Sequence, residues 1–203
     1  MLIKASRITN LTDARYFAAK EVAFLGFNLE EGTEGYLEPI YMKAIREWVE
    51  GPKIVGEFDR TPARTVLEAA KFYGLDAVQV SRTSDLEQLD GLEIILLVPG
   101  TENPDDLDTL FEQAAPFVQY FLLDFSGNQK AAAILQQDTE NWARLFARYP
   151  TLLDLDISAT DLPELLQKLQ PAGIALQGGE EEQVGVKSFD EVDEVFEVLG
   201  LEE

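Results

Sequence analysis

The sequence alternates between short apolar runs and longer segments in which apolar residues recur every three or four positions. The short runs are rich in Val, Ile, Leu and Phe, which is typical of buried strands, and the spacing in the longer segments is typical of amphipathic helices. The predicted strands are 2–5, 22–27, 53–58, 75–80, 93–98, 118–123, 151–156 and 172–176. The predicted helices are 11–20, 39–50, 62–73, 85–89, 104–115, 139–148, 161–169 and 188–199.

This alternation predicts parallel strands, because each helix carries the chain back to the end of the sheet where the next strand begins. Eight such units in 203 residues are typical of the α/β class and of a closed (β/α)8 barrel, the TIM barrel. We expect one barrel domain over residues 1–203, since no linker or second composition regime interrupts the pattern. A doubly wound open sheet is the alternative, and the lack of a Gly-rich phosphate loop after the first strand disfavours it.

The charge of the chain is strongly negative and unevenly placed. The net charge is −22, of which residues 1–82 contribute −1 and residues 83–203 contribute −21. Nucleic acids and anionic membranes are therefore not expected as partners. No apolar run has the length of a membrane span, and the first residues do not resemble a signal peptide, so we expect a cytoplasmic protein.

The sequence contains no Cys and no His. Disulfides and thiolate chemistry are thereby excluded, and so is the side chain that most often moves protons near neutral pH. Any acid–base chemistry is expected from carboxylates, lysine or tyrosine.

The first strand leads through Ser6 and Arg7 into a helix that Asn10 or Thr12 can cap. In a barrel of this kind the loop after each strand faces the active site, so Ser6 and Arg7 are expected at the mouth. This segment resembles the opening of the phosphoribosylanthranilate isomerase family, which reads Lys-x-Cys-Gly-Ile-Thr followed by an Asp-Ala pair. The matching positions are Lys4, Ile8, Thr9, Asn10, Asp13 and Ala14.

The resemblance continues along the chain in the same order. Val55-Gly56-Glu57-Phe58 is similar to the family's Val-Gly-Val-Phe third strand, and Phe121-Leu122-Leu123-Asp124 is similar to its Leu-Leu-Asp. Further similar segments are Leu25-Gly26-Phe27, Leu75-Asp76-Ala77-Val78-Gln79-Val80, and Gly178-Gly179 with Gly185-Val186-Lys187. The resemblance implies a TIM barrel without cofactor that performs an Amadori-type aldose–ketose isomerisation in tryptophan biosynthesis.

The resemblance also assigns chemical roles to two positions. The family's acid, at the end of strand six, corresponds to Asp124, and the position of its base corresponds to Ser6. The family has a cysteine there, and a serine hydroxyl needs an adjacent base. Strand alternation places Lys4 on the same side as Ser6, as the nearby candidate for that base. A serine that only hydrogen-bonds the first loop is the alternative.

Other departures concern the binding of the substrate. Where the family has an arginine in the second loop the chain has Gly35, and the family's His-Gly after strand four is Ser81-Arg82. After strand seven, where the family has Gly-Gly, the chain has Ile157-Ser158-Ala159-Thr160. Standard isomerase activity is therefore expected to be weak or absent. The alternative is a catalytically inactive barrel that binds an anionic metabolite or a protein partner.

Arginines offer a different way to hold an anion. Arg7, Arg60 and Arg82 follow strands one, three and four, so their guanidinium groups are predicted on one side of the mouth. Pairing with local acids such as Asp59 or Asp85 is the alternative. The candidate substrate-binding residues are Arg7, Arg60, Arg82, Gln79, Gly178 and Gly179. We expect a small anionic metabolite as ligand and a monomer or homodimer.

A metal site is a weaker hypothesis. Asp124, Asp154, Asp156 and the glutamates at 180–182 carry oxygen ligands suited to Mg²⁺ or Ca²⁺. Their spacing defines no site, so no metal is predicted. The three glutamates also oppose a phosphate site beside Gly178 and Gly179, because like charges repel.

Overall fold

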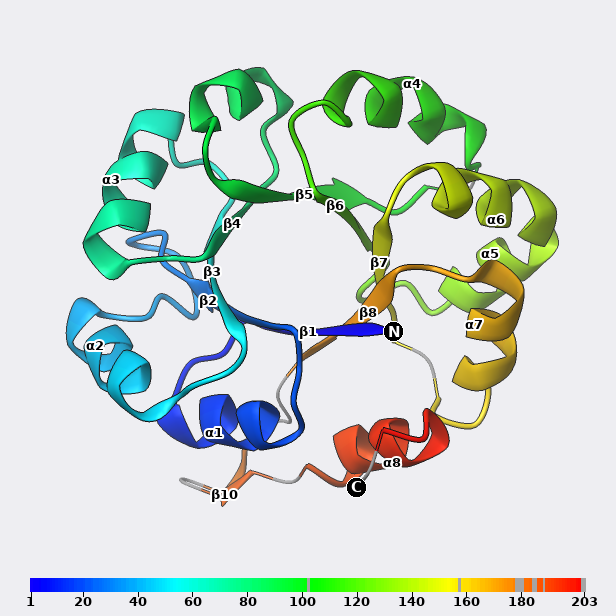
Figure 1. Ribbon diagram of the computed structural model, residues 1–203. Coiled ribbons are helices and arrows are strands. Elements are labelled where there is room, and N and C mark those ends of the chain that lie inside the picture. Colours follow the sequence, from blue (N-terminus) through cyan, green and yellow to red (C-terminus); the bar gives the residue numbers. More distant parts are fainter. Residues whose placement is uncertain (102, 157, 178–180, 184–185, 188, 202–203) are drawn as a thin grey trace.

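The computed structural model describes residues 1–101, 103–156, 158–177, 181–183, 186–187 and 189–201. Eight parallel strands close into a barrel in sequence order, with β1 paired to β8, and helices surround it (Figure 1). The strands are β1 (Leu2–Ser6), β2 (Phe24–Asn28), β3 (Lys53–Phe58), β4 (Ala77–Val80), β5 (Glu93–Pro99), β6 (Tyr120–Asp124), β7 (Thr151–Asp154) and β8 (Gly173–Gln177). The predicted (β/α)8 barrel is confirmed.

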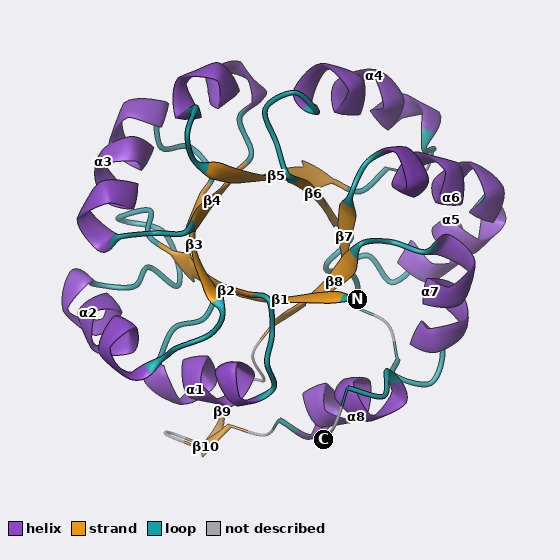
Figure 2. Cartoon of the chain, in the orientation of Figure 1, coloured by secondary structure: helices purple, strands orange, loops and turns teal. Residues whose placement is uncertain are grey.

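Helical segments link the strands on the outside of the barrel (Figure 2). They are α1 (Leu11–Ala19), α2 (Pro39–Trp48), α3 (Ala63–Tyr73), the 3₁₀ helix η1 (Thr83–Leu89), α4 (Asp105–Ala114), α5 (Ala131–Gln137), α6 (Thr139–Arg148), α7 (Leu162–Leu169) and α8 (Asp190–Val198). Within the described ranges no helix is long and apolar enough to cross a membrane.

Local sequence explains several of these boundaries. The Asn10 side chain accepts a hydrogen bond from the Asp13 backbone N–H at 2.9 Å, which makes Asn10 the cap of α1. Gly74 ends α3 in the left-handed conformation with φ of 62°. Pro39 occupies the first turn of α2, where a missing N–H is harmless.

Two features were not predicted. Helix α5 lies in the stretch between β6 and α6, and its seven residues are too few to show a clear helical period. A small antiparallel pair, β9 (Glu181–Gln183) and β10 (Val186–Lys187), follows β8 and lies outside the barrel sheet. Both strands of this pair are only two or three residues long, so neither gives an apolar run that marks a strand.

The barrel interior changes character along its axis. The part nearer the amino ends of the strands is an apolar cluster with one or two inward residues from each strand. The fully buried members are Phe24, Val55, Ala77, Ile95, Leu122, Leu152 and Ala175. Side chains alternate across a strand, so the next inward position toward each carboxyl end lies two residues further on. Those positions are polar on most strands: Lys4 and Ser6, Glu57, Gln79, Asp124, Asp154 and Gln177.

Candidate active site

A lysine–glutamate pair is buried at the carboxyl ends of β1 and β3. Lys4 Nζ lies 2.5 Å from Glu57 Oε1 and donates a second hydrogen bond, of 2.7 Å, to Ser6 Oγ. Lys4 is 0% exposed, Ser6 4% and Glu57 6%. A charge so deeply buried is stable only when it is paired and hydrogen-bonded, and here each charge has its partner. The predicted proximity of Lys4 to Ser6 is confirmed.

Gly26 provides the space for this pair. It is the inward-facing residue of β2, between β1 and β3. A Cβ at this position would lie 2.7 Å from Lys4 Nζ and closer still to Glu57 Oε1. Three neighbouring strands thus contribute a lysine, a glycine and a glutamate to one arrangement.

The second oxygen of Glu57 holds the first loop. The Arg7 backbone N–H donates to Glu57 Oε2 at 3.2 Å. Arg7 has φ of 53°, in the left-handed region that costs most residues other than glycine about 1–2 kcal/mol. The hydrogen bond to Glu57 supports this conformation. The position is one where the resembling family has glycine, which adopts a positive φ without strain.

Two carboxyl groups lie on the opposite side of the mouth. Asp124 and Asp154 end β6 and β7 and are direct partners in the register of these strands. Oδ1 of Asp124 accepts hydrogen bonds from Ser126, from the backbone N–H at 2.8 Å and from the hydroxyl at 2.6 Å. These bonds fix the orientation of the Asp124 carboxylate.

The pKa of Asp154 lies well above its ordinary value of 3.8. Burial, and after it the neighbouring Asp124 charge, raise the pKa of Asp154 to about 6. The charges of Lys4 and Arg7 and a hydrogen bond with Gln177 act in the opposite direction. A carboxyl group with a pKa of about 6 is available near neutral pH both as a proton donor and as a proton acceptor.

The arginines divide into two groups. Arg82 Nη1 donates to the backbone carbonyl of Arg60 at 3.2 Å, so the loops after β3 and β4 are joined. The Arg60 side chain is 88% exposed and lies 3.5 Å from Asp59, which agrees with the alternative of local pairing for this residue. Arg7 belongs to the other group, since its charge acts on Asp154. The structure therefore joins Arg60 with Arg82 and places Arg7 with the acidic residues.

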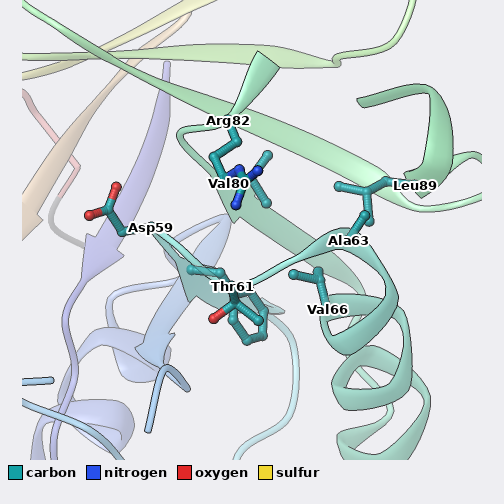
Figure 3. A pocket seen from close by; sticks show the side chains of 8 residues that line it. Asp59, Thr61, Ala63, Val66, Val80, Arg82 and Leu89 are labelled. Carbon is teal, nitrogen blue, oxygen red and sulfur yellow. The ribbon is translucent and has the colours of Figure 1, made fainter. Parts of the chain in front are cut away.

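A small pocket lies beneath Arg82. It has a volume of about 10 Å³, which is room for about one water molecule (Figure 3). Figure 3 shows the residues that surround it: Asp59, Thr61, Ala63, Val66, Val80, Arg82 and Leu89. This pocket is too small to hold a substrate.

Carboxylates of the chain itself accept hydrogen bonds from several backbone N–H groups around the mouth. The carboxylate of Glu30 accepts from the N–H groups of Asp59 and Arg60, at 2.7 and 3.0 Å. Asp156 Oδ2 accepts from the Gly127 N–H at 2.5 Å. Such N–H groups are the usual donors to bound anions. An anionic substrate must displace these carboxylates or bind elsewhere.

The remaining predicted residues are placed as follows. Gln79 is 8% exposed and faces the interior beside β3, and its Oε1 has no hydrogen-bond partner among the described residues. Gly178 and Gly179 lie outside the described residues, as does Glu180. Among the residues that the structure describes, no three Asp or Glu side chains come together as a group of metal ligands.

The sequence analysis missed Glu57 and considered Asp154 only as a metal ligand. The signal for Glu57 was present, because a single acidic residue interrupts the apolar strand Lys53–Phe58 at an inward position. Strand alternation alone does not reveal its partner. The contact with Lys4 joins residues 53 positions apart and depends on the barrel bringing β1 and β3 to either side of Gly26.

These features define a class of protein. A closed parallel barrel with polar, buried and titratable groups at the carboxyl ends of its strands has the layout of a TIM-barrel enzyme. The model of the N-(5'-phosphoribosyl)anthranilate (PRA) isomerase family matches residues 3–198 of the chain. The chain therefore belongs to this family.

Known relatives agree with this assignment. An N-(5'-phosphoribosyl)anthranilate isomerase from a Synechococcus species is 29% identical over 221 residues, covering 98% of this chain and 91% of that protein. The crystal structure of the enzyme from Thermus thermophilus has a TM-score of 0.75 and 26% identity, with 98% of each chain covered. A family structure in complex with reduced 1-(o-carboxyphenylamino)-1-deoxyribulose 5-phosphate has a TM-score of 0.76 at 18% identity, covering 98% of this chain and 99% of that one, which supports the fold alone.

Proposed function

We propose that this chain catalyses the family's class of reaction, the Amadori-type isomerisation of N-(5'-phosphoribosyl)anthranilate, at a rate far below that of a cysteine-bearing member. The observation that supports this proposal is the carboxyl pair at the ends of β6 and β7. The resemblance assigns the role of the acid to Asp124, and its register partner Asp154 has a pKa of about 6. The reaction needs one acid and one base, and the pair supplies both.

Ser6 is a poor candidate for the base. Its hydroxyl oxygen already accepts a hydrogen bond from Lys4, and the Lys4 ammonium is paired with Glu57. A charged lysine that donates to the serine oxygen does not take up the serine proton. A carboxylate must then fill the role of base, and Asp154 is the buried carboxyl group that titrates near neutral pH.

The chemistry can be written with these two groups. A proton from one carboxyl group passes to the ring oxygen as the bond from C1′ to that oxygen breaks, and the anthranilate nitrogen forms a double bond to C1′. The other carboxylate removes the proton from C2′. The electrons of that C–H bond form a double bond between C1′ and C2′, and the electrons of the C1′–N double bond return to nitrogen, which gives the enol. Proton return at C1′ and loss of the hydroxyl proton give the ketose. The pair regains its starting protonation, so no further reactant is needed.

Turnover of freshly generated N-(5'-phosphoribosyl)anthranilate tests the proposal directly. Asp124→Asn and Asp154→Asn are each expected to lower kcat at least about 100-fold, the usual contribution of a general acid or base. Ser6→Ala is expected to change kcat less than about threefold, because the hydroxyl moves no proton. Glu93→Gln, at the opposite end of the barrel, is the matched control. Activity that depends on Ser6 and is indifferent to Asp154 contradicts the proposal.

A barrel that binds without turnover is the second candidate. It is favoured by Ser6 at the position of the family's base, because the lysine beside this serine is already paired with Glu57. Calorimetry with a reduced substrate analogue that carries anthranilate and phosphate separates the two candidates. Micromolar binding that Arg82→Ala abolishes, without turnover in the wild type, supports the binding barrel. Turnover that Asp124→Asn abolishes supports the enzyme.

A further inference from the structure

Glu57 connects three groups that would otherwise be independent. One oxygen pairs with the Lys4 ammonium, which also bonds Ser6, and the other oxygen accepts the Arg7 backbone N–H. These contacts reach from β3 to both β1 and the loop that follows it. Glu57 itself does not contact Asp124 or Asp154 in any hydrogen bond or ion pair found among the described residues.

We propose that Glu57 is a positioning residue of this mouth, whose carboxylate fixes the Lys4 ammonium against Ser6 and holds Arg7 in its left-handed conformation. Both cations thereby act on Asp154 of β7 from fixed places. The inference deepens the proposed function, on which it rests for the role of that pair. Glu57 acts through Lys4 and Arg7 and is not itself a catalytic residue.

Space and charge both support this role. A Cβ on Gly26 would collide with the two charged ends of the pair, so the interior is shaped around them. A hydrophobic residue at position 57 would leave Lys4 buried without a counter-charge, which is far more costly than the pair itself. The same change would leave the Arg7 N–H without its acceptor while φ stays in the strained region.

The groups that act on Asp154 come from several elements. Lys4 of β1 and Arg7 of the first loop favour its charged form, and the Asp124 carboxylate of β6 opposes it. Gln177 of β8 adds a hydrogen bond. Glu57 neutralises part of the Lys4 charge. Removing the Glu57 charge and removing the Lys4 charge must therefore shift the pKa of Asp154 in opposite directions.

The test is a carbon NMR titration of the aspartate carboxyl groups in the protein without ligand. Asp154→Asn identifies the Asp154 signal. Lys4→Met is expected to raise the pKa of Asp154, since a cation is lost. Glu57→Gln keeps the shape of the side chain and removes its charge, so the pKa of Asp154 is expected to fall. Glu93→Gln, in the exposed Lys53–Glu93 pair at the opposite end of the barrel, is expected to leave the Asp154 titration unchanged.

Hydrogen exchange of the Arg7 amide gives the second reading. Glu57→Val is expected to speed this exchange at least about tenfold, and Glu93→Gln is expected not to change it. If Glu57→Val does not fold, the double variant Lys4→Met with Glu57→Val removes both charges together and should show the same loss of Arg7 protection. A merely space-filling Glu57 predicts an unchanged Asp154 titration in Glu57→Gln.

The proposal is overturned if the two single variants shift the Asp154 pKa in the same direction or not at all, with Arg7 exchange unaltered. Neither reading requires substrate or turnover. Failure of the isomerase assay therefore leaves this inference standing, and failure of the titration leaves the isomerase proposal to be judged on its own assay.

Discussion

The barrel contains two lysine–glutamate pairs with the same N···O distance at opposite ends. Lys4 and Glu57 lie 2.5 Å apart near the carboxyl ends of the strands, with side chains 0% and 8% exposed. Lys53 and Glu93 also lie 2.5 Å apart, where β3 and β5 begin, with side chains 52% and 21% exposed. The comparison separates the effect of burial from that of contact geometry, since only the surroundings differ strongly.

The difference has a physical cause and a functional meaning. Water solvates Lys53 and weakens its attraction to Glu93, whereas Lys4 has no solvent to replace Glu57. In barrels of this kind the carboxyl ends carry the chemistry and the other ends contribute to stability. The buried Lys4–Glu57 pair therefore lies at the end of the barrel where a fixed charge can serve chemistry. The exposed Lys53–Glu93 pair lies at the end that contributes to stability.

The largest expected effect comes from removing one partner of the buried pair. Glu57→Val should lower the free energy of unfolding by about 3–5 kcal/mol, because Lys4 is left as an uncompensated buried charge. Urea denaturation measures this loss. The double variant Lys4→Met with Glu57→Val should recover most of it, since an apolar replacement of both partners leaves no unpaired charge. A double variant as unstable as the single one contradicts this account.

The next effect is a dependence of stability on pH that originates at Asp154. Its folded-state pKa of about 6 lies above the ordinary value of 3.8. The folded protein therefore binds this proton more tightly, and the resulting stability is present at low pH and lost as the pH rises from about 4 to about 6. We expect Asp154→Asn to remove this decline, on the order of 2–3 kcal/mol. Urea denaturation at both ends of the range measures it, with the exposed Asp59→Asn as control.

A smaller effect is expected at Gly26. Gly26→Ala introduces a methyl group between Lys4 and Glu57, and neither side chain can move away without losing its partner. Overpacking of this kind usually costs about 1–3 kcal/mol. In the Lys4→Met and Glu57→Val background the same change should cost less, because the flexible methionine can yield. Equal costs in the two backgrounds would mean that the backbone, and not the pair, limits the space.

The smallest effect is expected at the exposed pair. Lys53→Met should lower the free energy of unfolding by less than about 1 kcal/mol, and this loss should be smaller at high salt, where the pair is screened. The hydrogen bond with Glu93 raises the pKa of Lys53 above its ordinary value of 10.5. The small contribution of the pair is therefore present at neutral pH and is lost only as the pH rises through that raised value. A loss as large as that at Glu57 would remove the contrast between the two ends.

The sequence predicted the barrel because the fold depends on a repeated local pattern. Each strand and helix is marked by residues close together in the chain, and the cap at Asn10 and the left-handed end at Gly74 are local as well. Helix α5 and the β9–β10 pair escaped prediction since each is too short for its period to be visible.

The site was predictable only in part. Strand ends alone place Ser6, Arg7 and Asp124 at the mouth, and alternation alone brings Lys4 to Ser6. The partners of Glu57 and the high pKa of Asp154 depend on depth and on neighbours from other strands, which no single stretch of sequence encodes. The substrate-binding roles of Arg60, Arg82 and Gln79 remain predictions.

The closure of the barrel also has a consequence for synthesis on the ribosome. Strand β1 pairs with β8 from Leu2 opposite Gly173 to Ser6 opposite Gln177. During synthesis β1 therefore lacks this neighbour until β8 has been made. Until residues 173–177 emerge, one edge of β1 has no neighbour in the sheet, and open strand edges invite pairing with other chains. A nascent chain that stalls before β8 thus exposes this edge, and completion of the last strand is the event that removes it.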